Sequence, residues 1–418
     1  MEDSNLYWER KTCRICNSPN IVKYLDFGMM PIATFFKKPG EKDTERIPLG
    51  VNFCKDCGLS QLDVVVKPEI LFSKDYPYSS SVSKTFQEHC RKMARTIREL
   101  YGNKEGLKIL DIASNDGCLL KEFRDEGFKV IGVDPAEEVA KKATAQGIET
   151  IYSFWDEKTA EEVLERIGKV EVVTATNVFA HLDGIHEFLE NAKKVMTNDG
   201  IFLIEASYAK RQIEKNEFDI VLHEHLSYYL VTPLEKFFSM HGMKISDVEI
   251  IEGLHGGTLR VIAVKNENTR IPIKQEKINK YMEEEKNSGL LDVERYMKVK
   301  EYAEEVKKET RRLLDELKSQ GKMIAGYGAP VKGNTFVNYC ELAKDDLRYI
   351  VDDTKEKQGL IYAGTEIPIV PSKKLEEERP DYLLILAWNF ADEIMKKTKG
   401  FKDSGGKYII AIPKPRII

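Results

Sequence analysis

The chain has 418 residues, of which 42 % are hydrophobic and 32 % are charged. At roughly 150 residues per domain, this length predicts about three domains rather than one. The 64 Lys and Arg against 69 Asp and Glu leave a net charge of −5, which argues against a general nucleic-acid binder. Since no apolar run approaches the roughly 18 residues that span a bilayer, and residues 1–4 do not begin a secretory signal, we expect a soluble cytoplasmic protein with no membrane partner.

Four of the seven cysteines form two close pairs, Cys13-x-x-Cys16 and Cys54-x-x-Cys57. Four thiolates supply the tetrahedral set that Zn²⁺ prefers and leave no open coordination position, so the predicted site is structural. A redox CxxC fits less well, because thioredoxin-type chemistry uses one pair in a βαβ context. The long interval between Cys16 and Cys54 predicts a small β-rich insertion, and we place the zinc-binding domain in residues 1–75.

A tract rich in tyrosine and serine precedes a predicted helix over residues 84–100 that Ser83 could cap. The tract fits a polar linker as well as it fits the wall of a pocket for a polyhydroxylated ligand. In the second case Tyr76 and Tyr78 would line the pocket.

Short apolar runs that alternate with helical stretches from Leu107 onward predict parallel βαβ units. The predicted elements are a strand from Lys108 that enters a tight turn, a helix over 118–126, and strands over 129–134, 170–177 and 200–206.

Polar residues at the carboxyl ends of these strands predict a cofactor site. The first turn has Gly117 as its one glycine, so the three-glycine dinucleotide fingerprint is absent. Asp111 lies at the first strand and Asp134 at the end of the second, where a carboxylate can accept both hydroxyls of a ribose. The pair suits S-adenosylmethionine, although either Asp alone could equally be a turn residue. The predicted cofactor-binding residues are Asp111, Ala113, Asn115, Gly117, Asp134, Pro135 and Asn177.

The segment His223-Glu224-His225 concentrates titratable side chains shortly after the predicted cofactor strands. It is not the HExxH zinc motif, because its histidines are two positions apart. If the segment is extended, His223 and His225 share one face and Glu224 points the other way. A Glu beside a His can raise its basicity for proton abstraction. His181 is predicted at the same sheet edge as the two aspartates.

Lys and Glu dominate residues 269–320, where apolar residues at helical spacing predict an amphipathic helix with a solvated charged face. A strand, a glycine turn and a helix start follow over residues 322–334. Backbone amides at such a helix start can hold a phosphate, and Lys332 would add charge. Later strands over 348–353 and 382–389 complete a second α/β sheet.

These motifs occur in the order seen in a known family: the CxxC pairs, Tyr-Pro-Tyr with its serines, Asp-Ile-Ala-Ser-Asn-Asp-Gly, Asn-Val-Phe-Ala-His, His-Glu-His, His-Gly-Gly-Thr-Leu-Arg and Gly-Tyr-Gly-Ala-Pro. The chain resembles the sugar C-methyltransferases, and within them the tetronitrose C3-methyltransferases, which methylate a nucleotide-linked 4-keto-deoxysugar. The resemblance covers nearly the whole chain. One position departs from it, because relatives usually have a tyrosine where this chain has Leu222.

The resemblance implies an α/β protein with a small zinc-binding domain and two Rossmann-like domains, at 76–268 for S-adenosylmethionine and at 269–418 with a long linking helix. It implies S-adenosylmethionine and structural Zn²⁺ as cofactors, and a nucleotide-linked keto-sugar as the partner of a monomer or weak dimer. The implied catalytic residues are His225, Glu224, His223, His181 and Tyr76. The predicted substrate-binding residues are Tyr78, His255, Gly326, Gly328, Lys332, Asn334 and Asn389.

Carbon acidity gives the expected mechanism. A C–H beside a ketone can be removed by a positioned imidazole if the enolate oxygen meets a donor. His225 would take the C3 proton, and Tyr76, His181 or His223 would stabilise the oxygen.

Two other functions remain open from the sequence. An NAD-dependent sugar-nucleotide oxidoreductase would use the second glycine turn, with Asp352 or Asp353 as the acid after its second strand. A zinc-containing binding protein without catalysis would follow if Leu222 marks a lost activity.

Overall fold

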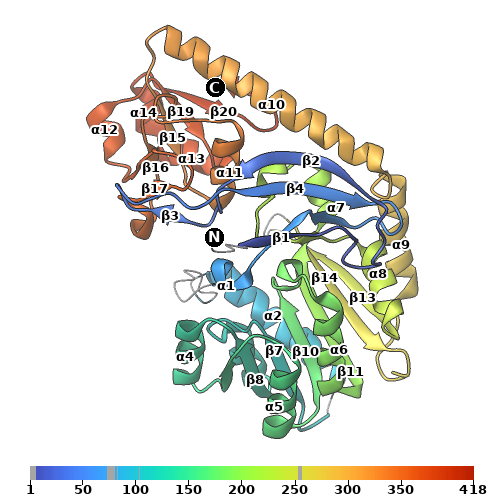
Figure 1. Cartoon of the computed structure of the whole chain (residues 1–418). Coiled ribbons are helices and arrows are strands. Elements are labelled where there is room, and N and C mark those ends of the chain that lie inside the picture. The colour runs from blue at the N-terminus through green and yellow to red at the C-terminus, as the bar shows by residue number, and fades with distance from the viewer. Residues whose placement is uncertain (1–5, 73–80, 82, 103, 253–256) are drawn as a thin grey trace, which may run out of the picture.

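The computed structural model describes residues 6–72, 81, 83–102, 104–252 and 257–418. Tyr76, Tyr78 and His255 lie outside the described residues. Figure 1 shows strands of the N-terminal region between a lobe built on a seven-stranded sheet and a lobe built on a six-stranded sheet. The prediction of an α/β protein with a small N-terminal domain and two larger α/β units is confirmed.

The N-terminal region is β-rich, as the interval between its cysteine pairs predicts. Its four-stranded antiparallel sheet has the order β12-β5-β4-β2. The strand β12 comes from the segment directly after His-Glu-His, so this distant segment is part of the N-terminal sheet. The strands of the region are β1 (Tyr7–Glu9), β2 (Ile21–Met30), β3 (Phe36–Lys37), β4 (Ile47–Cys54), β5 (Ser60–Leu62), β6 (Val64–Val66) and the added β12 (Ser227–Tyr228).

The seven-stranded sheet has the order β13-β14-β11-β10-β7-β8-β9. Strand β14 runs in the direction opposite to that of the other six strands. The strand order reverses between β7 and β10, and ligands of such sheets bind at this switch point, outside the carboxyl ends of the strands. The strands are β7 (Lys108–Ile112), β8 (Lys129–Asp134), β9 (Thr150–Tyr152), β10 (Val170–Thr176), β11 (Met196–Ser207), β13 (Met243–Ile251) and β14 (Thr258–Lys265).

Helices cover both faces of this sheet. The first of them begins as predicted, because the Ser83 side chain accepts a hydrogen bond from the Phe86 amide at 3.2 Å. The helices are α2 (Lys84–Tyr101), α3 (Cys118–Asp125), α4 (Glu137–Ala145), α5 (Glu157–Ile167), α6 (Ile185–Val195), α7 (Ala209–Glu214) and α8 (Val231–Met240).

The six-stranded sheet has the order β18-β16-β15-β19-β20-β21, with β21 antiparallel. Its switch point lies between β15 and β19. The elements are β15 (Ile324–Tyr327), α11 (Val331–Tyr339), β16 (Ile350–Val351), β17 (Ile361–Tyr362), β18 (Ile369–Val370), α12 (Lys374–Glu378), β19 (Tyr382–Ile385), α13 (Ala391–Lys397), α14 (Lys399–Asp403), β20 (Lys407–Ile410) and β21 (Arg416–Ile417).

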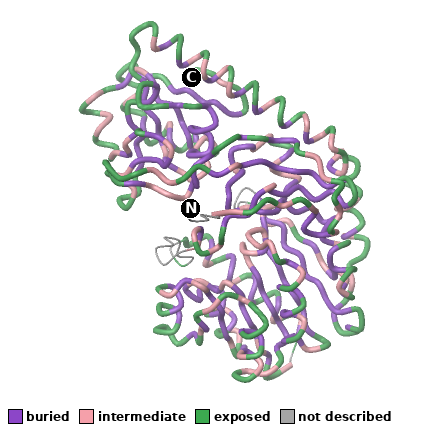
Figure 2. Tube along the Cα trace, in the orientation of Figure 1, coloured by how far each residue is buried: buried purple, intermediate pink, exposed green. Residues whose placement is uncertain are grey.

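The charged region before this sheet forms two helices rather than one, α9 (Gln275–Asn287) and α10 (Val293–Ser319). The chain turns between them at Gly289, whose φ of 69° lies in the left-handed region that ends helices. The helix α10 runs along one side of the molecule, with buried residues on its inner face and exposed residues outside (Figures 1 and 2). Among the described residues, no helix is long and apolar enough to cross a membrane.

Candidate functional site

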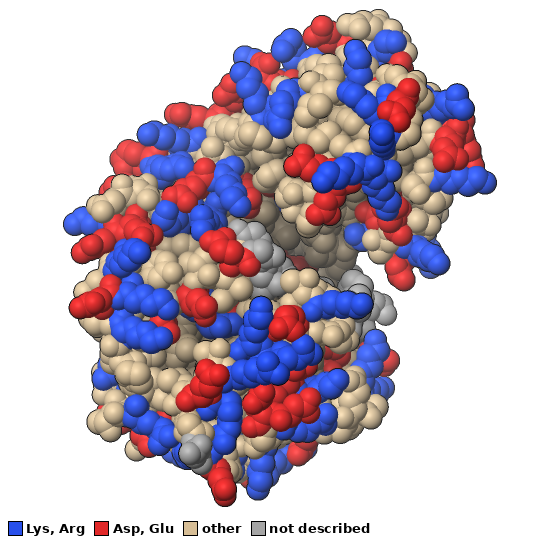
Figure 3. Space-filling model, turned by 180° about the vertical axis from the view of Figure 1, so that it is seen from behind, with Lys and Arg blue, Asp and Glu red and all other residues tan. Residues whose placement is uncertain are grey.

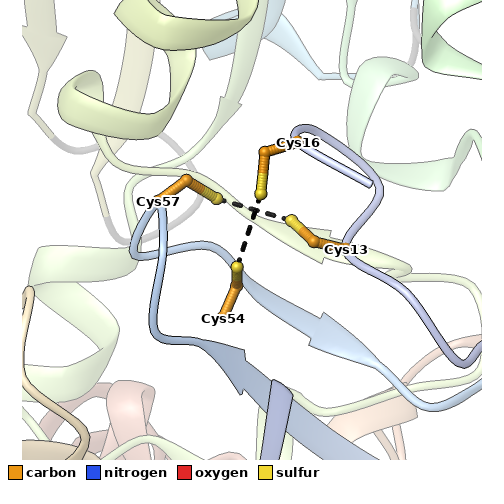
Figure 4. Close-up of side chains that lie close together, drawn as sticks. All are labelled: Cys13, Cys16, Cys54 and Cys57. Atoms are coloured by element: carbon orange, nitrogen blue, oxygen red, sulfur yellow. Dashed lines mark hydrogen bonds between the residues drawn. The ribbon is translucent and has the colours of Figure 1, made fainter. Parts of the chain in front are cut away.

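The four cysteines of the two pairs lie together. The Sγ atoms of Cys13 and Cys57 are 3.4 Å apart, those of Cys16 and Cys54 are 3.6 Å apart, and all four lie within 4.8 Å of one another. Figure 4 shows the side chains pointing toward a common centre. A tetrahedral zinc with Zn–S bonds of about 2.3 Å requires Sγ atoms about 3.8 Å apart, so the cluster fits the predicted metal.

The turn after β7 is held by the carboxylate that ends β8. Asp134 accepts hydrogen bonds from the amides of Asn115 and Ala136, both at 2.8 Å. The turn can approach β8 because Gly132 has no side chain, since a Cβ there would lie 2.3 Å from Ser114 Oγ. Asp134 therefore holds the turn after β7, and each of its oxygens keeps a lone pair that could accept from a ribose hydroxyl.

Several residues in the loops after β7 and β10 have left-handed backbone conformations. Ala113, Asn115 and Gly117 have φ values of 61°, 51° and 76°, and Asn177 after β10 has a φ of 56°. Non-glycine residues adopt this region rarely, and such strain concentrates where a loop must fit a ligand. The predicted cofactor residues of these two loops thus follow β7 and β10, the neighbouring strands on either side of the switch point.

Asp111 is buried at this edge and accepts a hydrogen bond from Thr174 Oγ1 at 2.6 Å. Burial raises the pKa of Asp111 to about 7, and the carboxylates of Asp134 and Glu205 add to the effect. A cluster of carboxylates fits a cofactor that carries a sulfonium and an ammonium group, because each cation offsets the repulsion among the acids. The residues present therefore fit S-adenosylmethionine.

Two histidine rings meet beside the crevice. The centroids of His181 and His225 are 5.3 Å apart in an edge-to-face arrangement. Burial, with a smaller effect of the neighbouring His225, lowers the pKa of His181 to about 3, so His181 is neutral at physiological pH. His225 Nδ1 lies 3.1 Å from the carbonyl oxygen of Ile220. Donation from Nδ1–H to this carbonyl leaves Nε2 as the basic nitrogen of His225.

The His-Glu-His segment is a turn, not an extended strand, because the amide of His225 donates to the carbonyl of Leu222 at 3.0 Å. As a result His223 and His225 do not share a face. His223 Nε2 lies 3.2 Å from the carbonyl of Pro48 in β4, and burial lowers the pKa of His223 to about 4. Glu224 is buried, and burial raises the pKa of its carboxyl to about 7.

The carboxyl edge of the six-stranded sheet reaches the same segment. Trp388 Nε1 donates to Asp219 Oδ2 at 2.7 Å, and Asp219 is fully buried in the 3₁₀ turn η3 (Phe218–Ile220). Lys332 Nζ lies 4.1 Å from the centre of the Trp388 ring and 3.9 Å from Asp219 Oδ2. Of the predicted substrate residues here, Asn389 is exposed, whereas Asn334 is buried and donates to the carbonyl of Ala33 at 3.1 Å.

The two glycines at this edge make room for protein atoms. A Cβ on Gly326 would lie 2.8 Å from Ile350 Cγ1, and one on Gly328 would lie 2.8 Å from Ala387 Cβ. The amide of Ala329 that follows donates to Asp352 Oδ2 at 2.6 Å. The second glycine turn is therefore held by a strand-end carboxylate, in the way that Asp134 holds the first.

Figure 3 shows the molecule hollowed between the lobe of the six-stranded sheet and the lobe of the seven-stranded sheet. The carboxyl edge of the six-stranded sheet contacts η3 through Trp388 and Asp219, and His181, which follows β10 of the seven-stranded sheet, contacts the turn at His225. Three residues in this region, Arg14, Asp219 and Trp388, were not predicted from the sequence, because none of them belongs to a known motif. The one available signal was charge, since Arg14 lies inside a CxxC pair and Asp219 lies close to His-Glu-His.

Three family models match the chain: a zinc binding domain at residues 13–72, a methyltransferase domain at 85–247 and a C-methyltransferase C-terminal domain at 253–413. The chain is 33 % identical over 413 residues to the C-methyltransferase NovU of Streptomyces niveus, covering 97 % of this chain and 96 % of that protein. It is also 33 % identical over 105 residues to a ubiquinone biosynthesis O-methyltransferase of Caulobacter sp. strain K31, covering 24 % of this chain and 40 % of that protein.

The fold, the acidic switch-point crevice and the four-cysteine cluster define a methyltransferase that uses S-adenosylmethionine and has a zinc-binding domain. Within this class, the chain belongs to the C-methyltransferase family represented by NovU. The predicted family and the two predicted cofactors are confirmed.

Proposed function

We propose that the protein methylates C3 of a nucleoside-diphosphate-linked 4-keto-deoxysugar. The observation that carries this proposal is the pair of histidines, His181 and His225, beside the cofactor crevice. One member is neutral, and the other is oriented by a backbone carbonyl, which suits an oxyanion donor and a general base respectively. NovU, a C-methyltransferase by name, covers the same length of chain.

His225 Nε2 takes the C3 proton, and the electron pair of the C–H bond moves into the enolate, with negative charge on the keto oxygen. S-adenosylmethionine supplies an electrophilic methyl group on its sulfonium. Asp134 would hold the ribose of this cofactor, and transfer of its methyl group to the C3 carbanion would leave S-adenosylhomocysteine. The proton on His225 then passes to solvent.

The neutral imidazole of His181 is our first choice as donor to the enolate oxygen. Its Nδ1 is enclosed and has no hydrogen-bond partner among the described residues, so a substrate oxygen would satisfy it. Tyr76, outside the described residues, stays in the proposal as a further donor, whereas His223 does not, because its Nε2–H already donates to the carbonyl of Pro48. Glu224 stays as an auxiliary acid or base, since a carboxyl with its pKa raised to about 7 can serve either role near neutral pH.

The switch point of the six-stranded sheet is the proposed site of the nucleotide. Lys332 supplies a positive charge for the diphosphate, and the half-buried ring of Trp388 offers a surface on which a base can stack. Asn389, Gly326 and Gly328 shape this edge, while Tyr78 and His255 remain proposed contacts outside the described residues. The domain boundaries we propose are 1–75, 76–268 and 269–418.

Hydrogen exchange in D₂O without the methyl donor tests this proposal. The probes are thymidine, uridine, guanosine and cytidine diphosphate forms of 4-keto-6-deoxyhexoses, with deuterium at C3 measured separately from C5. We expect enzyme-dependent C3 exchange for at least one probe. In His225→Ala the rate should fall by about 10²–10⁴, the usual contribution of a general base.

The control is Lys194→Ala. Lys194 is exposed on α6 and pairs with Glu157, away from His225, so its loss should leave exchange unchanged. Exchange that survives in His225→Ala would contradict the proposed base. Thermal stabilisation by NAD but not by S-adenosylhomocysteine would contradict the proposed cofactor site and favour an oxidoreductase.

A further inference from the structure

The side chain of Arg14 is fully buried although it lies within the first cysteine pair. Its Nε donates to Asp183 Oδ1 at 2.9 Å. Its Nη1 donates to the carbonyls of Leu62 and Leu226, each at 2.9 Å. Burying a guanidinium costs free energy unless its donors are satisfied. Nε and Nη1 have these partners, whereas Nη2 is buried with no hydrogen-bond partner among the described residues, so the three contacts define the place of the side chain.

Two of the partners of Arg14, Asp183 and Leu226, belong to the two segments that contain His181 and His225. Asp183 lies two residues after His181, in the turn that follows η2 (Phe179–His181). Leu226 directly follows His225. One guanidinium therefore bridges the carboxylate of Asp183 and the backbone carbonyl of Leu226, one from each histidine segment.

The root of the Arg14 side chain is fixed by the metal-binding segment. Cys13 and Cys16 flank it and hold two corners of the thiol cluster. The Arg14 amide donates to Gln61 Oε1 at 2.8 Å, and its carbonyl lies 2.9 Å from His186 Nε2. The side chain of Arg14 is thus held by the two histidine segments and by Leu62, and its backbone is held by Gln61, His186 and the flanking cysteines.

We propose that Arg14 is a positioning residue for His181 and His225, through which the zinc-binding domain acts on proton abstraction. This inference rests on the proposed role of His225 as the base. It assigns the zinc-binding domain a part in the geometry of the reaction, beyond its part in stability. In this proposal, the guanidinium of Arg14 holds Asp183 through Nε and Leu226 through Nη1, and so keeps the two histidine segments at a constant distance.

A purely structural role predicts a different result. If Arg14 only holds domains together, its loss lowers the melting temperature and zinc retention, while the folded, zinc-loaded fraction keeps its exchange rate. If it positions the histidines, that folded fraction exchanges the C3 proton more slowly at unchanged zinc content. The experiment therefore compares rates per zinc-loaded chain.

The test uses Arg14→Gln in the full chain, with zinc measured by metal analysis, S-adenosylhomocysteine affinity by calorimetry, and C3 exchange with the same keto-sugar probes. We expect one zinc per chain, cofactor affinity within about twofold, and exchange at least about tenfold slower, since small misplacements of catalytic groups have effects of this size. The matched control is Lys236→Met. Lys236 Nζ donates to the carbonyl of Asp56 inside the second cysteine pair at 3.2 Å, and its loss should leave the rate unchanged.

Asp183→Asn provides a second variant in case Arg14→Gln does not fold, because an amide oxygen can still accept one hydrogen bond but loses the charge. We expect it to slow exchange about threefold to tenfold, because it weakens the charge-assisted bonds that Asp183 accepts from Arg14 and from Arg10. Exchange within twofold of wild type in either folded, zinc-loaded variant would overturn the inference. Absence of exchange in the wild-type protein is a separate outcome, which overturns the proposed function and this inference with it.

Discussion

The ionisation of Glu224 should be visible in the pH dependence of stability. Its pKa is raised by burial from 4.5 to about 7, so the folded protein holds a proton there that the unfolded chain has lost. Stability should therefore fall as the pH rises from about 4.5 to about 7, by up to about 3 kcal/mol for this shift. Glu224→Gln, whose amide resembles the protonated carboxyl, should melt at the same temperature as wild type at pH 4.5 and higher than wild type at pH 7.5.

The control for this comparison is Glu309→Gln on the outer face of α10. That side chain bonds only to Arg312 at the described surface, so its substitution should give no pH-dependent difference. Melting curves at six pH values would check both variants. Equal melting temperatures for Glu224→Gln and wild type at pH 7.5 would show that Glu224 is ionised without cost.

At the residue scale, the sequence predicted those site residues that can be recognised from their neighbours along the chain. The four cysteines and the strand-end acid Asp134 follow from spacing and from the end of a strand, and the structure places each where its motif requires. The burial of Arg14 could not be predicted, because it depends on Asp183 and Leu226, which are far away in the sequence.

Gly326 in β15 is a position at which the packing of two strands leaves no room for a side chain. A Cβ there would lie 2.8 Å from Ile350 Cγ1 in the neighbouring strand. Gly326→Ala should destabilise the protein by about 1–3 kcal/mol, as overpacking does, and leave the affinity for S-adenosylhomocysteine unchanged. Urea unfolding midpoints and calorimetry would measure the two effects.

Gly400→Ala is the matched control, because no atom lies within 4 Å of a Cβ at Gly400 in α14. It should be neutral or stabilise by up to about 1 kcal/mol. If Gly326→Ala were as stable as Gly400→Ala, the result would contradict the close packing of β15 against β16 at Gly326.

At the element scale, periodicity predicted strands β7, β8, β10, β11, β15, β16 and β19 of the two sheets. It did not predict β9, β13, β14, β18, β20 and β21, nor the turns between helices. The strand over 129–134 and the helix from Lys84 agree with the structure. The region 269–320 was expected to be one helix, yet Gly289 divides it, because a single left-handed residue interrupts a pattern that is otherwise continuous. The turn at His225 was missed because its hydrogen bond depends on tertiary packing.

At the scale of the whole molecule, the metal should stabilise the junction of the three regions. The zinc-binding segment lies next to β4 and β5, and β5 pairs with β12 from the far side of His-Glu-His. Cys57→Ser should lose zinc and lower the melting temperature by on the order of 10 °C, since structural zinc contributes directly to folding. Differential scanning calorimetry and metal analysis would measure both.

Cys340→Ser is the control, since Cys340 is equally buried in the described structure but lies outside the thiol cluster. It should retain one zinc per chain. Loss of zinc from Cys340→Ser, or full zinc in Cys57→Ser, would contradict the assignment of the site.

The order of the motifs predicted three units, but not that they share sheets. Strand β12 completes the N-terminal sheet, and β3 pairs with β17 of the C-terminal region. Pairings between strands so distant in sequence leave no periodic signal, because each strand is only two residues long. This sharing explains how a small zinc-binding region can contact both larger lobes.

The most direct test of the central claim is the mass and methyl position of the product. The protein is incubated with S-adenosylmethionine carrying a trideuterated methyl group and with each keto-sugar nucleotide in turn. We predict that one nucleotide sugar gains a CD₃ group bonded to C3 in place of the C3 hydrogen. A methyl group found on oxygen, or no mass gain with any sugar of the panel, would contradict the account.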